Sequence, residues 1–147
     1  DSLSKLNTHG VEIIPQTMPP FPWLFGGQFF HNLFVDPMEA VEFCRNHGYR
    51  LCLDISHSQL AVAYQKSSLK EFVDLVGPYV GHLHLVGAEG FDGEGLQIGD
   101  GEINFPKLAD QLEKLAPQAG FIPEIWQGHT NGGGGFWLAL ERLEQWF

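Results

Sequence analysis

The sequence predicts an α/β protein built around a parallel sheet, and three observations lead to this prediction. Short apolar runs recur along the chain, with the length of strands that are buried on both faces. Segments of helical periodicity alternate with these runs, an order that is typical of strand–helix–strand crossovers. The 147 residues are 44% hydrophobic and 18% charged, enough apolar material for the core of a single domain spanning residues 1–147.

Four apolar runs are the predicted strands. Each is bounded by turn-forming or polar residues, and the first ten residues contain no convincing strand of their own. The runs are residues 11–14 (VEII), 50–54 (RLCLD), 80–86 (VGHLHLV) and 121–126 (FIPEIW).

The first predicted helix starts with a clear signal. Asp36 can cap the helix, Pro37 occupies its first position, and Glu39 follows in the first turn. Gly48 is a suitable residue to end it, because glycine readily adopts the left-handed conformation of a helix C-terminus.

Three more helices are predicted further along the chain. Ser68 and Glu71 have the spacing of a capping box, which predicts a helix start at residue 68. The last two helices are predicted from apolar stripes at spacings of three and four residues. These stripes are Phe105, Leu108, Leu112 and Leu115, and then Phe136, Leu140, Leu143 and Phe147.

Four strand–helix units are half of a closed eight-unit barrel, which takes about 250 residues. The fold class that we predict is therefore a parallel (βα)4 half of a TIM-type barrel. An exposed edge strand invites pairing with another chain. We therefore expect a homo-oligomer, with the barrel completed by dimerisation.

Charge and composition exclude several function classes. The formal net charge of −10 disfavours a nucleic-acid partner, and the 8 Lys and Arg residues form no cluster. No apolar run reaches the roughly 18 residues that a membrane span needs. The polar start shows no signal peptide. Cys44 and Cys52 form no metal or redox motif and fit a reducing compartment, so we expect a cytoplasmic protein without a membrane partner.

Each predicted strand carries an ionisable residue. These residues are Glu12, Asp54, His84 and Glu124, separated by 42, 30 and 40 residues, or one strand–helix unit each. Ligands bind at the carboxyl ends of parallel strands, and a mixed oxygen and nitrogen set suits Mn²⁺, Mg²⁺, Co²⁺ or Zn²⁺. Taken singly, each residue has a plainer interpretation, such as a helix cap or a buried hydrogen-bonding group.

Four motifs carry a family resemblance: LCLDISH, GHLHL, DGEGLQIGDGEINFPKL and FIPEIWQGH. They resemble the second half of a xylose isomerase-like TIM barrel, of the sugar phosphate isomerase/epimerase type. The resemblance implies that Glu12, Asp54, His84 and Glu124 bind a divalent metal. It also implies that Glu12 and Glu124 exchange protons with the substrate, and that His57 contacts the sugar.

The chain departs from this family pattern in three places. The loop before the IGDGE segment lacks the histidine of the endonuclease IV branch, so a nuclease with a trinuclear zinc site is disfavoured. Residues 85–95 contain no Lys or Arg where epimerases often carry a basic residue. The front half of the barrel, which supplies part of the pocket wall, has no counterpart in the sequence.

Several loop features stay open between a ligand contact and a plainer role. The run of four glycines at 132–135, within the segment 128–137, could hold a phosphate, although a flexible linker is favoured. The glycine-rich loop 92–102 could bind sugar hydroxyls or could simply form turns. His129 is a candidate substrate contact. The long segment 15–35 predicts a lid or wall, and its aromatic residues could stack on a sugar or form a dimer contact: Trp23, Phe25, Phe29 and Phe30.

These observations predict a divalent-metal-dependent isomerase or epimerase that acts on a small sugar or sugar phosphate. The reaction would proceed by proton transfer next to a metal-bound carbonyl. The alternative is a non-catalytic half-barrel that binds a sugar or a partner chain.

Overall fold

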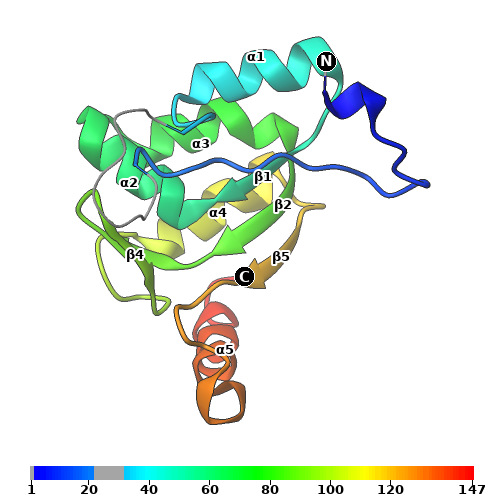
Figure 1. Cartoon of the computed structure of the whole chain (residues 1–147). Coiled ribbons are helices and arrows are strands. Elements are labelled where there is room, and N and C mark those ends of the chain that lie inside the picture. The colour runs from blue at the N-terminus through cyan, green and yellow to red at the C-terminus, as the bar shows by residue number, and fades with distance from the viewer. Residues whose placement is uncertain (1, 22–31) are drawn as a thin grey trace.

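A three-stranded parallel sheet with the order β1-β2-β5 lies at the centre of the fold (Figure 1). The computed structural model describes residues 2–21 and 32–147, so the aromatic residues predicted at positions 23–30 lie outside the described residues. The strands and helices of the main body are β1 (Leu51–Asp54), β2 (Val80–Leu85), β5 (Gly120–Pro123), α1 (Pro37–His47), α2 (Ile55–Gln65), α3 (Leu69–Val76), α4 (Phe105–Leu115) and α5 (Thr130–Leu143). Two short 3₁₀ helices, η1 (Leu3–Lys5) and η2 (Gly77–Tyr79), and the strands β3 (Gly87–Glu89) and β4 (Gly93–Leu96) complete the list.

This arrangement confirms the predicted fold class of a parallel α/β half-barrel. The register of the sheet pairs Asp54 with His84 across β1 and β2, and His84 with Ile122 across β2 and β5. The carboxyl ends of the three parallel strands therefore lie together at one end of the sheet. The backbone pairing of β1 with β2 places Asp54 beside His84.

The predicted strand at residues 11–14 is wrong. The chain pairs with β1 only later, through a parallel bridge between Gln16 and Cys52. The Cys52 backbone N–H donates to the Pro15 carbonyl over 2.7 Å, and the Thr17 N–H donates to the Cys52 carbonyl over 3.0 Å. Prolines at 15, 19 and 20 limit this pairing, because proline has no N–H to donate.

The two faces of the sheet differ in polarity because side chains alternate along a strand. Leu53, Leu83 and Leu85 point into the hydrophobic core with Phe72 of α3 and Leu108 of α4. Each leucine buried in this way contributes about 1.5–3 kcal/mol relative to an exposed one. The opposite face carries the polar side chains, and the candidate site lies there.

His82 and His84 share that polar face, as the two-residue period of a strand predicts. Their ring centroids are 5.5 Å apart. Both side chains are partly exposed, whereas Leu83 between them is buried.

Helix starts and stops mostly follow the sequence signals. The Asp36 side chain accepts a hydrogen bond from the Met38 N–H, and α1 ends at Gly48 with a left-handed φ of 72°. The helix predicted from Ser68 exists as α3, but the Ser68 side chain makes no capping hydrogen bond. The predicted third helix, with its stripe from Phe105 to Leu115, is α4.

Helix α2 and the strands β3 and β4 were not predicted, whereas the fourth predicted helix exists as α5. Helix α2 follows β1 directly, so two helices rather than one connect β1 to β2. The glycine-rich loop folds back as the antiparallel pair β3–β4. Helix α5 begins at Thr130, before the predicted stripe, and its first turn contains left-handed residues at 131–133. No helix within residues 2–21 and 32–147 is both long and apolar enough to cross a lipid bilayer.

Candidate metal centre

Asp54 lies where β1 ends and α2 begins, and both elements fix its side chain. It is the N-cap of α2, and its Oδ1 accepts a hydrogen bond of 2.9 Å from the His57 N–H. The residue is only 1% exposed. Its backbone is held by Thr17, whose hydroxyl accepts from the Asp54 N–H over 3.0 Å. The other carboxylate oxygen, Oδ2, points toward the polar face.

His84 stands beside Asp54 on the neighbouring strand. Its Nδ1 lies 3.5 Å from Asp54 Oδ2 and 2.7 Å from Glu124 Oε2, a carboxylate that follows β5. Yet this buried nitrogen makes no hydrogen bond of acceptable geometry within the described residues. Asp54 first, then Cys52 and Glu124, raise the pKa of His84 to about 12, and His84 in turn lowers the pKa of Glu124.

Asp54, His84 and Glu124 fit a divalent cation. One donor atom of each side chain lies within 4.8 Å of the others, so small side-chain movements would let one ion contact all three. A nitrogen between two carboxylates without a well-directed hydrogen bond is the arrangement that a shared cation would satisfy. Two oxygens and one imidazole nitrogen suit a borderline metal such as Mn²⁺, Co²⁺ or Zn²⁺.

Glu12, which was expected to be a ligand and a proton-transfer group, does not lie in this cluster. Its carboxylate forms a bidentate ion pair with Arg50. Arg50 directly precedes β1, so this pair lies at the opposite end of the strand from Asp54. Residues 11–14 were expected to pair with β1, but the residue that pairs there is Gln16. Gln16, not Glu12, lies level with β1, and four residues of extended chain span about 13 Å.

Gln16 occupies the place beside Asp54 that was expected for Glu12. Its Nε2 donates to Asp54 Oδ2 over 3.0 Å and lies 3.4 Å from His57 Nδ1. The sequence signal that could have indicated this residue is its position between two prolines (15 and 19), where the chain stays extended. An amide at this point holds the carboxylate of Asp54 without adding a negative charge.

His57 is fixed in orientation by the backbone. Its Nδ1 lies 3.0 Å from the Thr17 carbonyl, which can only accept, so Nδ1 carries a hydrogen and donates. The other nitrogen, Nε2, lies 3.5 Å from Glu94 Oε2. Burial opposes the charged imidazolium, but Glu94, Asp54 and the Thr17 carbonyl outweigh it and raise the pKa of His57.

A small cavity of about 150 Å³ lies next to the cluster. Glu94, which the sequence analysis did not single out, comes from β4 and lines it. Trp126 is 65% exposed and lines it too. The lining residues are Asp54, Ser56, His57, Val86, Glu94, Gly95, Glu124 and Trp126.

His129 is not among the residues that line this cavity. It is the N-cap residue of α5, its side chain is exposed, and it makes no capping hydrogen bond. The site therefore brings together Asp54, His84, Glu124 and His57, and leaves Glu12 and His129 outside.

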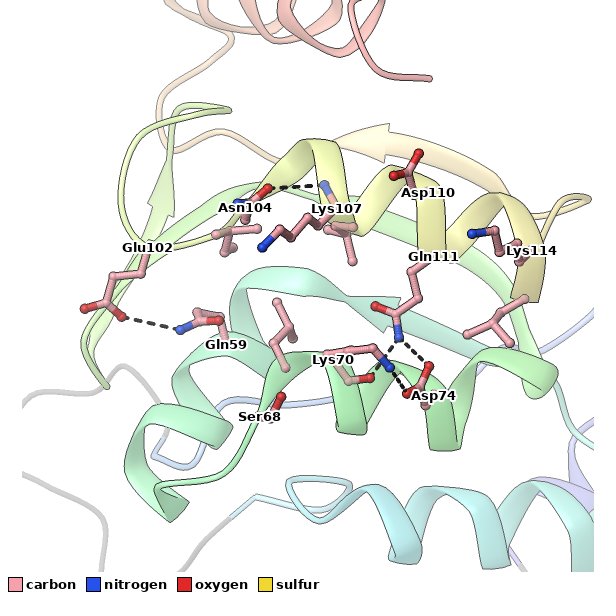
Figure 2. Close-up of a pocket in the computed structure, with 14 residues that line it drawn as sticks. Gln59, Ser68, Lys70, Asp74, Glu102, Asn104, Lys107, Asp110, Gln111 and Lys114 are labelled. Atoms are coloured by element: carbon pink, nitrogen blue, oxygen red, sulfur yellow. Dashed lines mark hydrogen bonds and ion pairs between the residues drawn. The ribbon is translucent and has the colours of Figure 1, made fainter.

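A larger groove of about 560 Å³ lies elsewhere, between α3 and α4 (Figure 2). Polar contacts cross it: Gln111 Nε2 donates to the Lys70 carbonyl over 2.8 Å and to Asp74 over 2.7 Å. Lys70 also pairs with Asp74. The Gln111 contacts join the two packed helices, and no predicted metal ligand lies among the residues of the groove.

Comparison with known proteins agrees with this fold. A solved structure described as a D-tagatose 3-epimerase-like protein is similar, with a TM-score of 0.62 and 21% identity. The match covers 93% of this chain and 49% of that one, so the chain spans about half the length of this structural relative. At this identity the likeness shows the fold alone. No curated protein matches the sequence.

The family model described as "Xylose isomerase-like TIM barrel" matches residues 1–145. This match covers nearly the whole chain, including Asp54, His84 and Glu124. The chain therefore belongs to the xylose isomerase-like TIM barrel family.

Proposed function

We propose that this chain carries the divalent-metal site of a sugar isomerase or epimerase. The observation that supports this proposal is the convergence of Asp54, His84 and Glu124 from three parallel strands, with a buried His84 nitrogen that lacks a well-directed hydrogen bond. The ion would be Mn²⁺, Mg²⁺, Co²⁺ or Zn²⁺, held by Asp54, His84 and Glu124.

Isomerising or epimerising a sugar requires removal of a proton next to a carbonyl. When bound, the divalent ion would polarise that carbonyl and favour the loss of the neighbouring proton. Glu124 is the proposed base: it is half-exposed toward the cavity, and His84 lowers its pKa, so it is ionised near neutral pH.

His57 and Gln16 position the substrate and the ligands in this proposal. His57 Nε2 lines the cavity and is oriented by the Thr17 carbonyl behind it, so it can hold a substrate oxygen. Gln16 holds Asp54 Oδ2, which keeps this carboxylate turned toward His84. Glu12 is given no role in this proposal, because it pairs with Arg50 at the other end of β1.

The test is metal analysis combined with an assay for ketose conversion in added Mn²⁺. We expect stoichiometric metal, and we expect Glu124→Gln to lower kcat by at least about 100-fold, the usual minimum for loss of a general base. Glu89→Gln, on the exposed part of β3, is the control with the same charge change. Full activity of Glu124→Gln would refute the proposed role of this residue.

A second candidate function is a half-barrel that binds a sugar or a partner chain without catalysis. Glu124 is 53% exposed, so the site is open on one side within the described residues. Stoichiometric metal without turnover of any ketose would favour this alternative.

A further inference from the structure

We infer that the cavity beside the metal centre selects an uncharged sugar over a sugar phosphate, with Glu94 and Ser56 binding its hydroxyl groups. Glu94 is the residue that sets this preference. The inference rests on the proposed function and names its substrate class.

Ser56 supplies the first observation. The residue is only 1% exposed and lines the cavity, and its hydroxyl has no hydrogen-bond partner within the described residues. A buried hydroxyl without a partner is costly. A ligand hydroxyl entering the cavity can satisfy it, because hydroxyls both donate and accept.

Glu94 supplies the second observation, since it is held in place at the cavity. Its Oε2 lies 3.5 Å from His57 Nε2, and its side chain is 27% exposed. The neighbouring Gly95 carbonyl accepts a hydrogen bond of 2.9 Å from the Trp126 N–H, which ties β4 to the segment after β5. A carboxylate positioned in this way accepts hydrogen bonds from sugar hydroxyls.

The wall next to Glu94 also suits a sugar. A Cβ added at Gly95 would lie 2.9 Å from the Trp126 Cβ, so the hairpin and the tryptophan are in close contact. The largely exposed Trp126 side chain offers an aromatic surface. The apolar face of a sugar ring can pack against such a surface.

The charge of the cavity disfavours a phosphate. Three carboxylates line it, from Asp54, Glu94 and Glu124. A divalent ion would offset two of these charges, and His57 already lies against the third, Glu94. None of the eight Lys and Arg residues, all of which lie within the described ranges, lines this cavity. An anion would therefore meet carboxylates without any Lys or Arg to pair with, which costs affinity.

The basic residues lie elsewhere. Lys70, Lys107 and Lys114 line the separate groove between α3 and α4 (Figure 2). Arg50 is paired with Glu12, and Arg142 with Asp100. The glycines at 132–135 do not line the cavity either, so the start of α5 does not face it. The start of α2 does reach the cavity, but it is already capped by the carboxylate of Asp54.

The test measures binding of D-fructose and D-fructose 6-phosphate by calorimetry, with the full chain both Mn²⁺-loaded and metal-free. We expect the phosphate ester to bind at least about 10-fold more weakly than the free sugar. Glu94→Gln should weaken D-fructose binding about 10-fold, the usual effect of losing a hydrogen bond to a charged group. Ser56→Ala should also weaken D-fructose binding. In the ketose assay this variant should raise KM and leave kcat nearly unchanged.

Two further variants sharpen the test. Glu94→Lys should reverse the preference, so that the phosphate ester binds more tightly than the free sugar. Glu89→Gln changes the same charge on the same hairpin, outside the cavity, and should bind both compounds as the unaltered chain does.

The outcomes separate this inference from the proposed function. Equal or tighter binding of the ester by the unaltered chain overturns the selectivity, and so does Glu94→Gln behaving like Glu89→Gln. Selective binding of D-fructose without any turnover overturns the enzymatic function but supports the binding preference. Absence of binding to both compounds overturns both.

Discussion

Asp54 combines two roles that the sequence could only offer as alternatives. Its Oδ1 caps α2, and its Oδ2 faces His84 and Glu124. The two oxygens of one carboxylate point to different partners, so a helix cap and a proposed metal ligand share a residue. Capping also fixes the rotamer of the ligand before any ion binds.

Substituting asparagine for Asp54 separates these roles. Asn is as good an N-cap as Asp, so Asp54→Asn should keep the cap of α2 and lose only the stability that the carboxylate gives by facing charged His84. Because a charged ligand is lost, Mn²⁺ affinity should fall at least about 10-fold, a change that calorimetry measures. Asp54→Ala should lose the cap as well, at a cost of about 1 kcal/mol.

Glu12→Gln is the comparison for this experiment, because it removes the ligand that the sequence suggested. It should bind Mn²⁺ with the affinity of the unaltered chain. A loss equal to that of Asp54→Asn would mean that Glu12 reaches the metal centre after all.

The pKa values at the centre predict a pH dependence. Asp54, together with Cys52 and Glu124, raises the pKa of His84 to about 12, so the metal-free protein carries a proton there at pH 7. This raised value stabilises the metal-free fold fully below about pH 6.5 and is lost as the pH rises through about 12. Binding a cation through Nδ1 requires that proton to leave.

We therefore expect release of about one proton when Mn²⁺ binds at pH 7, and tighter binding as the pH rises. Calorimetry in two buffers with different ionisation enthalpies measures the number of protons released. Identical heats in both buffers would show that His84 is not a protonated ligand.

At the scale of the element, a helix could be predicted where a capping side chain stands next to residues whose backbone preferences suit the ends of a helix. Asp36, Pro37 and Gly48 define α1 from local chemistry alone. Helix α2 was missed because six of its residues are buried, including Ile55, Leu60 and Val62, so it lacks a polar face that would give a clear stripe.

The cap of α1 gives a stability prediction. Asp36→Ala should lower the free energy of unfolding by about 1 kcal/mol, because the Met38 N–H loses its acceptor. Asp36→Ser keeps an acceptor and should cost much less. Urea unfolding followed by circular dichroism measures both, and equal costs for the two variants would contradict the capping role.

At the scale of the whole molecule, the sheet has one open edge among the described residues. The segment at Gln16 covers the outer edge of β1, whereas β5 ends the sheet (Figure 1). Phe121 and Ile122 of β5 are exposed, and so are Trp137 and Leu138 of α5. An open, apolar edge favours association with another chain.

We propose that a second copy of this chain covers the β5 edge, as expected for a half-barrel. The chain should then be a dimer at micromolar concentration, and Ile122→Lys should shift it toward the monomer. Light scattering after size-exclusion chromatography measures the mass. A monomer in the unaltered chain would remove this proposal.

The sequence by itself determined the alternation of strands and helices, the caps of α1, and the candidates Asp54, His84 and Glu124. These features depend on local chemistry and on the rule that the carboxyl ends of parallel strands lie at the same end of the sheet. Tertiary structure decided what depends on register and on contacts between distant segments. It placed Gln16 rather than Glu12 beside Asp54, and it brought Glu94 to the cavity through a hairpin. A shift of a few residues in an extended segment leaves its composition unchanged but moves a side chain to the other end of a strand, so only the pairing could show it.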